Sequence, residues 1–362
     1  MKLPAPWPDR LSKRSLRGIA LGLSVGALGG FVAHWAHVPL AWMLGALFFT
    51  MAASLSRLPV EVPTWLRMYF IVLLGLFLGE SFDRITLEDL SRWPITLTGA
   101  ILYCPIGGGI AYLFYRHIAR EERSTAICEA IPGGLSAIIL ISNSMGADER
   151  SVALSQSLRI SIVVLLAPVI AFWLLGLPTP DASSDTRGSV ISVVEFSLLL
   201  FASVALIWLL ARMGMPLPAL VAPVIASAIL RMGGFAEGVL PHWLIEVSLV
   251  VLGASIGSRF AGVAVSKWLA VAGVTFFGTL ILMGVSFVFA IVMTWLTGIE
   301  LFPLLLAYAP GGVAEMSIIA LAIGADPGFV AVHHVVRITF ILLTLPLFAA
   351  WLMRRHAAKA GG

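Results

Sequence analysis

The segment PGGLSAIILISNSMGADERSVALSQSLRISIVVLLAP, residues 132–168, occurs a second time in altered form as PGGVAEMSIIALAIGADPGFVAVHHVVRITFILLTLP, residues 310–346. A constant shift of 178 residues aligns the two without a gap, and it also aligns residues 65–82 with 243–260. One residue of slippage further upstream, Pro39 meets Pro216. Chance does not easily preserve such a match, so the sequence predicts an internal repeat that covers nearly the whole chain.

The composition places this repeat in a membrane. Hydrophobic residues make up 59% of the 362 residues, charged residues only 12%, and the mean hydropathy is +1.00. A soluble domain carries about a quarter of its residues charged. We therefore expect membrane spans in the ten apolar runs at 17–37, 39–56, 65–82, 94–115, 152–177, 189–211, 216–233, 243–260, 268–297 and 329–353.

Two further apolar segments, 125–146 and 303–324, are interrupted by Gly-Gly and contain acidic residues, so we expect broken or re-entrant helices there. The predicted fold is an all-α polytopic membrane protein with two inverted repeats, each of about five transmembrane helices and one broken helix. The expected boundaries are a cytoplasmic segment at 1–16, repeat one at 17–177, a polar connector at 178–188, repeat two at 189–355 and a tail at 356–362.

The basic residues predict the topology. Arg159 and Arg337 lie inside the apolar segments and are left out of the count. If the broken segments do not cross, 17 Lys and Arg lie on the N-terminal side and 4 opposite; if they cross, the counts are 15 and 6. The positive-inside rule modestly favours the first, inverted arrangement. We expect a multi-pass protein of the bacterial inner membrane, with both termini cytoplasmic and the connector periplasmic. The first apolar run lacks a small-residue cleavage site, which predicts an uncleaved helix.

Metal and nucleic-acid chemistry are not indicated. Cys104 and Cys128 have no metal-ligand spacing, and the seven histidines are scattered. His333 and His334 are adjacent, which is poor geometry for chelation. The net charge of +4 comes from basic residues spread among loops rather than from a basic patch. We expect no cofactor, no metal, no nucleic acid and no enzymatic activity.

The paired segments PGGLSAIILISNSMGAD and APGGVAEMSIIALAIGAD, each followed by an arginine, resemble the AbrB-like integral membrane proteins of Gram-negative bacteria. The resemblance covers about residues 15–355. It implies two copies of one membrane domain, and members carry labels of ammonia monooxygenase or of regulator. They look unrelated to the soluble DNA-binding AbrB of spore formers. The resemblance implies no set of catalytic residues.

The two Pro-Gly-Gly sequences are candidate binding elements. Proline and glycine end regular structure, and a helix that restarts after them presents free N–H groups and the positive end of its dipole, which suits an anion. The alternative is that each sequence forms only a tight turn or a close packing contact. The candidate residues of this site are Pro132, Gly133, Gly134, Ser136, Pro310, Gly311, Gly312, Glu315 and Ser317.

Arginines inside apolar helices require anionic partners, because an unpaired charge there is costly. We expect ion pairs that join the broken elements to the helices that follow them, with direct contact to a solute as the alternative. The members of this predicted charge network are Glu129, Asp148, Arg159, Asp326 and Arg337.

The acids differ between the repeats, since Glu129 aligns with Ala307 and Glu315 aligns with Ala137. A carboxyl group in a poorly hydrated cavity can bind a proton near neutral pH, so Glu315 is the preferred candidate for ion coupling and Glu129 the second. The Gly-xxx-Gly pairs, Gly75 with Gly79 and Gly253 with Gly257, predict close helix packing.

The predicted function is a secondary transporter or exporter of a small solute, anionic or zwitterionic, in the lipid bilayer, with protons or sodium as candidate coupling ions. The first alternative is a membrane-embedded regulator of gene expression that does not bind DNA directly, and the less favoured one is an enzyme of the ammonia monooxygenase type. A homodimer is compatible with the sequence. Neither the solute nor the direction of transport follows from it.

Overall fold

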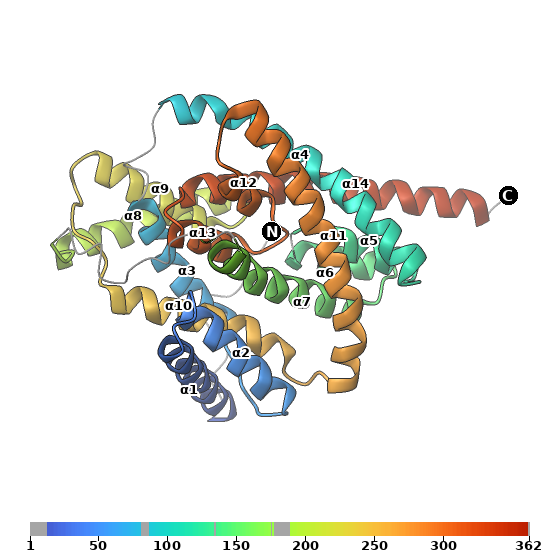
Figure 1. The fold of residues 1–362 in the computed structure, drawn as a ribbon, viewed down its shortest axis with the longest axis horizontal. Coiled ribbons are helices and arrows are strands. Elements are labelled where there is room, and N and C mark those ends of the chain that lie inside the picture. The colour runs from blue at the N-terminus through green and yellow to red at the C-terminus, as the bar shows by residue number, and fades with distance from the viewer. Residues whose placement is uncertain (1–12, 81–86, 134, 175, 177–188, 361–362) are drawn as a thin grey trace. The chain divides into compact units, whose positions relative to one another are not determined.

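The computed structural model describes residues 13–80, 87–133, 135–174, 176 and 189–360 (Figure 1). Throughout these residues the regular structure is helical, apart from an isolated bridge between Val190 and Val239. The helices are α1 (Lys13–Trp35), α2 (Ala41–Leu55), α3 (Thr64–Gly79), α4 (Leu87–Leu113), α5 (Arg123–Ala130), α6 (Leu135–Ser144), α7 (Glu149–Pro168), α8 (Val193–Arg212), α9 (Pro218–Met232), α10 (His242–Gly257), α11 (Val265–Thr297), α12 (Leu301–Tyr308), α13 (Val313–Ala322) and α14 (Pro327–Ala360). Short π-helical turns extend α4 at Phe114–Ile118 and α7 at Val169–Leu174, and a 3-10 turn follows α10 at Ser258–Phe260.

The predicted all-α membrane fold is confirmed. Within the described part of the chain, seven helices are long and apolar enough to cross a bilayer: Ser15–Trp35, Ser91–Ile118, Glu149–Phe172, Val193–Arg212, His242–Phe260, Val265–Thr297 and Pro327–Phe348. The other three expected spans coincide with α2, α3 and α9, which are 15 or 16 residues long. At 1.5 Å per residue these are shorter than the roughly 30 Å hydrocarbon core. The inverted orientation of the repeats stays a prediction, as do the repeat boundaries.

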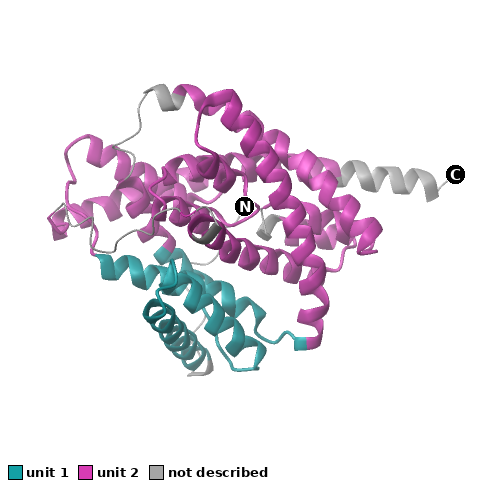
Figure 2. Ribbon diagram, viewed as in Figure 1, with its two compact units in different colours: residues 1–70, 242–265 teal, residues 71–241, 266–362 magenta. Residues whose placement is uncertain are grey.

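The chain divides into two compact units, coloured separately in Figure 2. Unit 1 comprises residues 1–70 and 242–265, and unit 2 comprises 71–241 and 266–362. Each unit therefore combines segments from both sequence repeats. The polar connector expected at 178–188 lies outside the described residues, and so do residues 1–12 of the expected N-terminal segment. The tail expected at 356–362 is helical as far as Ala360.

In unit 1, helix α2 packs against both α1 and α10. The contact with α10 is close because it is made at glycines. A β-carbon on Gly253 would overlap the carbonyl oxygen of Met43, and one on Gly257 would overlap the side chain of Thr50. Ser54 adds a hydrogen bond from its hydroxyl to the carbonyl oxygen of Gly257, at 3.0 Å. The predicted packing role of this glycine pair is confirmed.

Unit 2 contains an equivalent three-helix group. Helix α9 packs against α8, and residues 71–79 of α3 pack against α9. A β-carbon on Gly75 would lie 2.9 Å from the carbonyl oxygen of Leu220, and one on Gly79 would overlap Ser227. Ser227 donates a hydrogen bond to the carbonyl oxygen of Leu76 at 2.8 Å. In both groups, two helices from one repeat hold the Gly-xxx-Gly helix of the other.

The two interrupted segments are confirmed as broken helices, and both lie in unit 2. The first runs through α5 and α6 with a break that includes Ile131–Gly133, and the second runs through α12 and α13 with a turn at Ala309–Gly312. Helix α6 contacts α14, and α13 contacts α7. Each second half-helix thus touches the arginine-containing helix of the other repeat. In Figure 1, α13 lies beside the green helix α7.

Candidate functional site

Arg159, on α7, holds the end of the first half-helix. Its side chain is buried, and Nη1 donates hydrogen bonds to the carbonyl oxygens of Ile131 at 2.9 Å and Glu129 at 3.3 Å. Nη2 donates to Oε1 of Gln156, and Nε2 of Gln156 donates to the carbonyl oxygen of Cys128 at 2.8 Å. The last carbonyls of a helix have no partner within it and carry the negative end of its dipole. The Arg159 guanidinium donates hydrogen bonds to these carbonyls of α5 and places a positive charge at the negative end of its dipole.

Arg337, on α14, does the same for the second half-helix. Nη1 donates to the carbonyl oxygens of Tyr308 and Ala309, both at 2.8 Å. Nη2 lies 3.0 Å from Nδ1 of His334, and Nε2 of His334 lies 2.9 Å from the carbonyl oxygen of Leu306. A carbonyl can only accept, so Nε2 carries the proton and Nδ1 accepts from the arginine. His334 is therefore neutral in this arrangement.

The two arginine clamps, Arg159 with Gln156 and Arg337 with His334, are equivalent under the 178-residue shift. The shift maps Gln156 onto His334, and it maps the acceptors Cys128 and Ile131 onto Leu306 and Ala309. Gln and neutral His share one property, which is that each offers both a donor and an acceptor. Neither Gln156 nor His334 was predicted as a site residue from the sequence. The signal was a bifunctional side chain three residues before each arginine.

The expected ion pairs with aspartate are corrected by the structure. Asp148 caps the N-terminus of α7 and accepts hydrogen bonds from the backbone N–H groups of Arg150 and Ser151 and from the Ser151 hydroxyl at 2.6 Å. Asp326 accepts from the N–H of Gly328 at 2.8 Å, at the start of α14. Eleven residues of helix place each aspartate about 16 Å from its arginine, which excludes a direct pair.

Glu129 is buried at the end of α5, and its carboxylate is near enough to Arg159 to attract it. The hydrogen bond from Arg159 to this residue nevertheless goes to the backbone carbonyl of Glu129. The predicted charge network is thus present only in part. Backbone carbonyls supply most of the negative charge that was expected from carboxylates.

The candidate residues of the first Pro-Gly-Gly turn are described in part. Pro132 is buried, and Gly133 has φ +121°, a conformation that only glycine adopts readily. Gly134 lies outside the described residues, and so does the side chain of Ser136. Gly133 faces the other repeat, because a β-carbon built on it would lie 3.8 Å from Nε and 3.9 Å from Nη2 of Arg337.

The second Pro-Gly-Gly turn, at Pro310, places Gly312 at the N-cap of α13 with Glu315 in the first turn. The Glu315 side chain is buried and folds back over the turn, since a β-carbon on Gly312 would overlap its carboxylate. A carboxylate is favourable at the positive end of a helix dipole. The protein's own side chain therefore occupies the position that the sequence analysis assigned to an anionic solute.

Several buried polar atoms near these turns have no hydrogen-bond partner among the described residues. They are the hydroxyl of Ser317 on α13 and the Nε atoms of Arg159 and Arg337. The Arg337 guanidinium lies 5.9 Å from the centre of the Tyr103 ring. Unpartnered buried polar groups are rare and call for an explanation.

Threonine contacts join the two repeats beside the clamps. The hydroxyl of Thr275 on α11 lies 3.1 Å from Oγ of Ser155. Nε2 of His333 lies 2.8 Å from Oγ1 of Thr96 on α4. Ser155 and His333 align under the 178-residue shift, so each repeat again meets a residue of the other.

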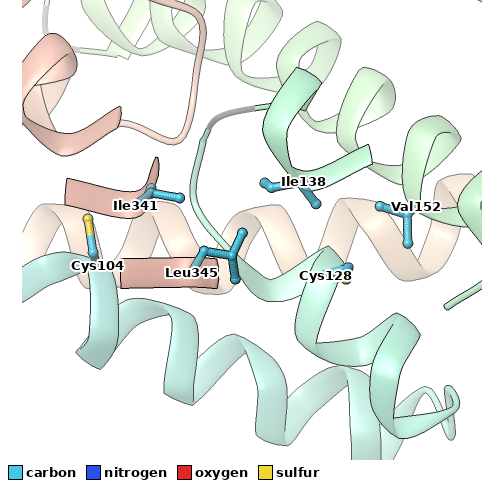
Figure 3. Packing of buried hydrophobic residues seen from close by; sticks show 6 residues of the cluster. All are labelled: Cys104, Cys128, Ile138, Val152, Ile341 and Leu345. Atoms are coloured by element: carbon cyan, nitrogen blue, oxygen red, sulfur yellow. The ribbon is translucent and has the colours of Figure 1, made fainter. Parts of the chain in front are cut away.

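A cavity of about 430 Å³ lies beside the first turn, between α4, α5 and α14. Figure 3 shows part of its wall: Cys104 from α4 and Ile341 and Leu345 from α14. Cys128, Ile138 and Val152 pack in the same apolar cluster but do not line the cavity. The cavity is apolar at the point where it reaches Pro132.

These features define a multi-pass helical membrane protein with two broken helices that contact each other's arginine helices. The chain matches the family model described as "Transition state regulatory protein AbrB" over residues 8–353, and it belongs to this family.

Two relatives show the same extent of similarity. "Uncharacterized protein YhjN" of Bacillus subtilis (strain 168) is 29% identical, over 93% of this chain and 94% of the relative. "Putative regulator AbrB" of Escherichia coli (strain K12) is 24% identical, over 92% of this chain and 94% of the relative. The predicted family resemblance is confirmed, and the first relative extends it beyond Gram-negative bacteria.

Proposed function

We propose that the protein is a secondary transporter or exporter of a small anionic or zwitterionic solute, bound where the two broken elements meet. The observation that carries the proposal is the reciprocal contact of α6 with α14 and of α13 with α7. Broken helices that meet between two repeats are the arrangement in which secondary transporters bind solutes and coupling ions. The chain is proposed to act without enzymatic chemistry, metal or cofactor.

The electrostatics favour an anionic group on the solute. Arg159 and Arg337 are buried, and their Nε atoms have no hydrogen-bond partner in the described residues. An anionic group that reaches either guanidinium would satisfy such a donor. The Ser317 hydroxyl could then serve a second polar group of the solute.

Glu315 is the proposed coupling group, which would take up and release a proton as the site opens to either side of the membrane. Its carboxylate is buried in the first turn of α13, directly after the Pro-Gly-Gly turn, and α13 contacts α7. A substitution by glutamine keeps the size and the helix-capping oxygen but cannot titrate. Sodium remains the other candidate coupling ion.

The test is flux in proteoliposomes under an imposed pH gradient, after a counterflow screen of small organic anions has found a solute. Glu315→Gln should fold normally and lose the pH dependence of flux. Glu149→Gln is the matched control, since Glu149 lies in the first turn of α7 but is exposed. Wild-type pH dependence in Glu315→Gln would remove Glu315 from the mechanism, and absence of flux for every anion would remove the transport proposal.

The second candidate is a role in regulating gene expression, which the name of the Escherichia coli relative favours. This role would be indirect, through the membrane. A folded variant that has lost flux but restores the transcript levels of a deletion strain would favour regulation over transport.

The proposed topology places both termini in the cytoplasm of the inner membrane and the connector at 178–188 in the periplasm. Single cysteines at Ser184 and Arg120 test it with an impermeant thiol reagent on intact cells. Labelling should occur at position 184 and not at position 120. The opposite pattern would reverse the topology.

A homodimer is also proposed, and cross-linking in membranes would test it.

A further inference from the structure

The cavity between α4, α5 and α14 suits an apolar group. Of its fifteen lining residues, four carry a polar side-chain atom, namely Cys104, Tyr112, Arg123 and Thr344. The hydroxyl of Thr344 is already bonded to the carbonyl oxygen of Phe340 at 2.7 Å. A volume of about 430 Å³ is within the range of small-molecule sites, roughly 300 to 1,000 Å³.

The two ends of the cavity differ. Its lining along α5 runs from the exposed Arg123 to Pro132 at the turn, a rise of about 13 Å if the helical 1.5 Å per residue is used. The end at Pro132 also contains Ile341, which lies one helical turn after Arg337 on α14. This inner end therefore leads toward the second arginine clamp.

Arg337 has one unpaired guanidinium nitrogen at that end. Its Nη1 is occupied by two carbonyls and Nη2 donates one hydrogen to Nδ1 of His334, but Nε has no partner among the described residues. The Nε and Nη2 atoms lie 3.8 and 3.9 Å from the position of a β-carbon on Gly133. Two parallel N–H groups on one edge of a guanidinium match the two oxygens of a carboxylate. Pro132, the neighbour of Gly133, lines the cavity, so this turn adjoins both the cavity and the Arg337 guanidinium.

We propose that the cavity binds the apolar part of an organic monocarboxylate, with the carboxylate directed toward Pro132 and Gly133 and paired with Arg337 when this turn moves. The inference rests on the proposed transport function and names its substrate class. A protonated amine at the same place would be repelled by the positive charge of Arg337, which lies beside Gly133. An alcohol would not supply a negative charge to pair with the Arg337 guanidinium.

The natural cysteines provide a direct test. The chain has two cysteines, and Cys104 lines the cavity whereas Cys128 does not. In Cys128→Ala, the rate at which N-ethylmaleimide alkylates Cys104 reports whether the cavity is occupied. The probes are 4-phenylbutyrate, 4-phenylbutan-1-ol and 4-phenylbutylamine, which share one apolar body. At about ten times Kd, a bound probe should slow alkylation about tenfold, because only the free fraction reacts.

We expect protection by the carboxylate and little or none by the alcohol and the amine. Equal protection by all three probes would show an apolar cavity without an anion end and would overturn the inference. So would the absence of protection by 4-phenylbutyrate. Arg123→Gln should keep the protection, since Arg123 lies at the outer end; loss of protection in this variant would place the carboxylate there and overturn the proposed orientation.

Two glycines give a matched pair of variants. A β-carbon on Gly109, which lines the cavity on α4, has nothing within 4 Å, and the same holds for Gly284 on α11, which does not line it. Gly109→Leu should fill the cavity, so alkylation becomes slow and insensitive to 4-phenylbutyrate. Gly284→Leu should retain protection. If Gly109→Leu also retains it, the probe binds elsewhere and the inference fails.

Flux of labelled 4-phenylbutyrate in proteoliposomes separates this inference from the transport proposal. Protection of Cys104 without flux would uphold the binding site and contradict transport. Flux of a different solute with no protection by the carboxylate would uphold transport and contradict the substrate class.

Discussion

The first and second broken elements make the same clamp with different chemistry around it. Arg159 and Arg337 both bind the last carbonyls of a half-helix, through equivalent acceptors. The position that aligns with Glu315 is Ala137, so only the second element has a carboxylate at the start of its second half-helix. The shared residues therefore hold the break in the helix, and the residues that differ are where a ligand or a proton can distinguish the two halves.

Removal of either arginine should have the largest effect. Arg159→Ala and Arg337→Ala each leave two or more buried carbonyls unpaired, at about 1 to 3 kcal/mol for each group, so we expect a loss of about 3 to 5 kcal/mol of stability. Thermal melting and the yield of monodisperse protein in detergent measure it. Arg150→Ala, an exposed change on the same helix as Arg159, is the control. Normal stability with lost solute binding would assign the arginine to the ligand instead.

Substitutions of Gln156 and His334 test whether each clamp needs one side chain that both donates and accepts a hydrogen bond. Gln156→Leu leaves the Cys128 carbonyl and Nη2 of Arg159 without a partner, which should cost about 2 to 4 kcal/mol. His334→Gln replaces one bifunctional side chain by the one found in the other repeat, so it should cost less than about 1 kcal/mol. Chemical denaturation in mixed micelles would compare them. Equal losses would show that the two clamps are not interchangeable.

The first glycines of the two turns should differ in their tolerance of a side chain. Gly133 has φ +121°, and an alanine there should cost about 1 to 3 kcal/mol in backbone strain. Gly311 is not among the residues with positive φ, and its β-carbon would meet the flexible end of Met316 at 3.0 Å. Gly311→Ala should therefore have the smaller effect in a thermal melt. The reverse order would mean that the two turns exchange conformations in solution.

The smallest expected effect is at the N-cap of α7. Asp148→Ala removes a capping carboxylate from an exposed helix start and should cost about 0.5 to 1 kcal/mol at neutral pH. The hydrogen bond from the Ser151 hydroxyl holds the pKa of the Asp148 carboxyl below its ordinary value. Its contribution is therefore complete above about pH 4 and disappears as the pH falls through the lowered pKa. Melting of the wild type and the variant should converge in acid; a constant difference would contradict the capping role.

The helices could be predicted well from the sequence because hydropathy, and the proline and glycine residues that interrupt helices, are local signals. The two breaks at Pro132 and Pro310 and the positions of the long helices could all be placed from them. The Gly253 and Gly257 pair was correctly interpreted as a packing element, although its partner helix could not be named. Such partners are set by tertiary contacts that no local pattern contains.

The partners of the arginines were predicted less well. A sequence shows side-chain charges but not which backbone carbonyls end a helix without a partner, so Asp148 and Asp326 were chosen in place of Ile131 and Ala309. Helix caps satisfy these aspartates locally. Whether Glu315 couples to an ion is a question of solvation and access, which the sequence does not contain.

The exchange of helices between the repeats also constrains how the protein is made. Helix α2 also packs against α1, which precedes it, but its contact with the glycines of α10 forms only after roughly 200 more residues, which is about 10 to 40 seconds of synthesis at 5 to 20 residues per second. Throughout that interval the face of α2 that will contact α10 lies in the bilayer without that helix. The nascent chain is then exposed to premature association and to quality-control proteases, and a membrane chaperone that covers this face would raise the yield of the mature protein.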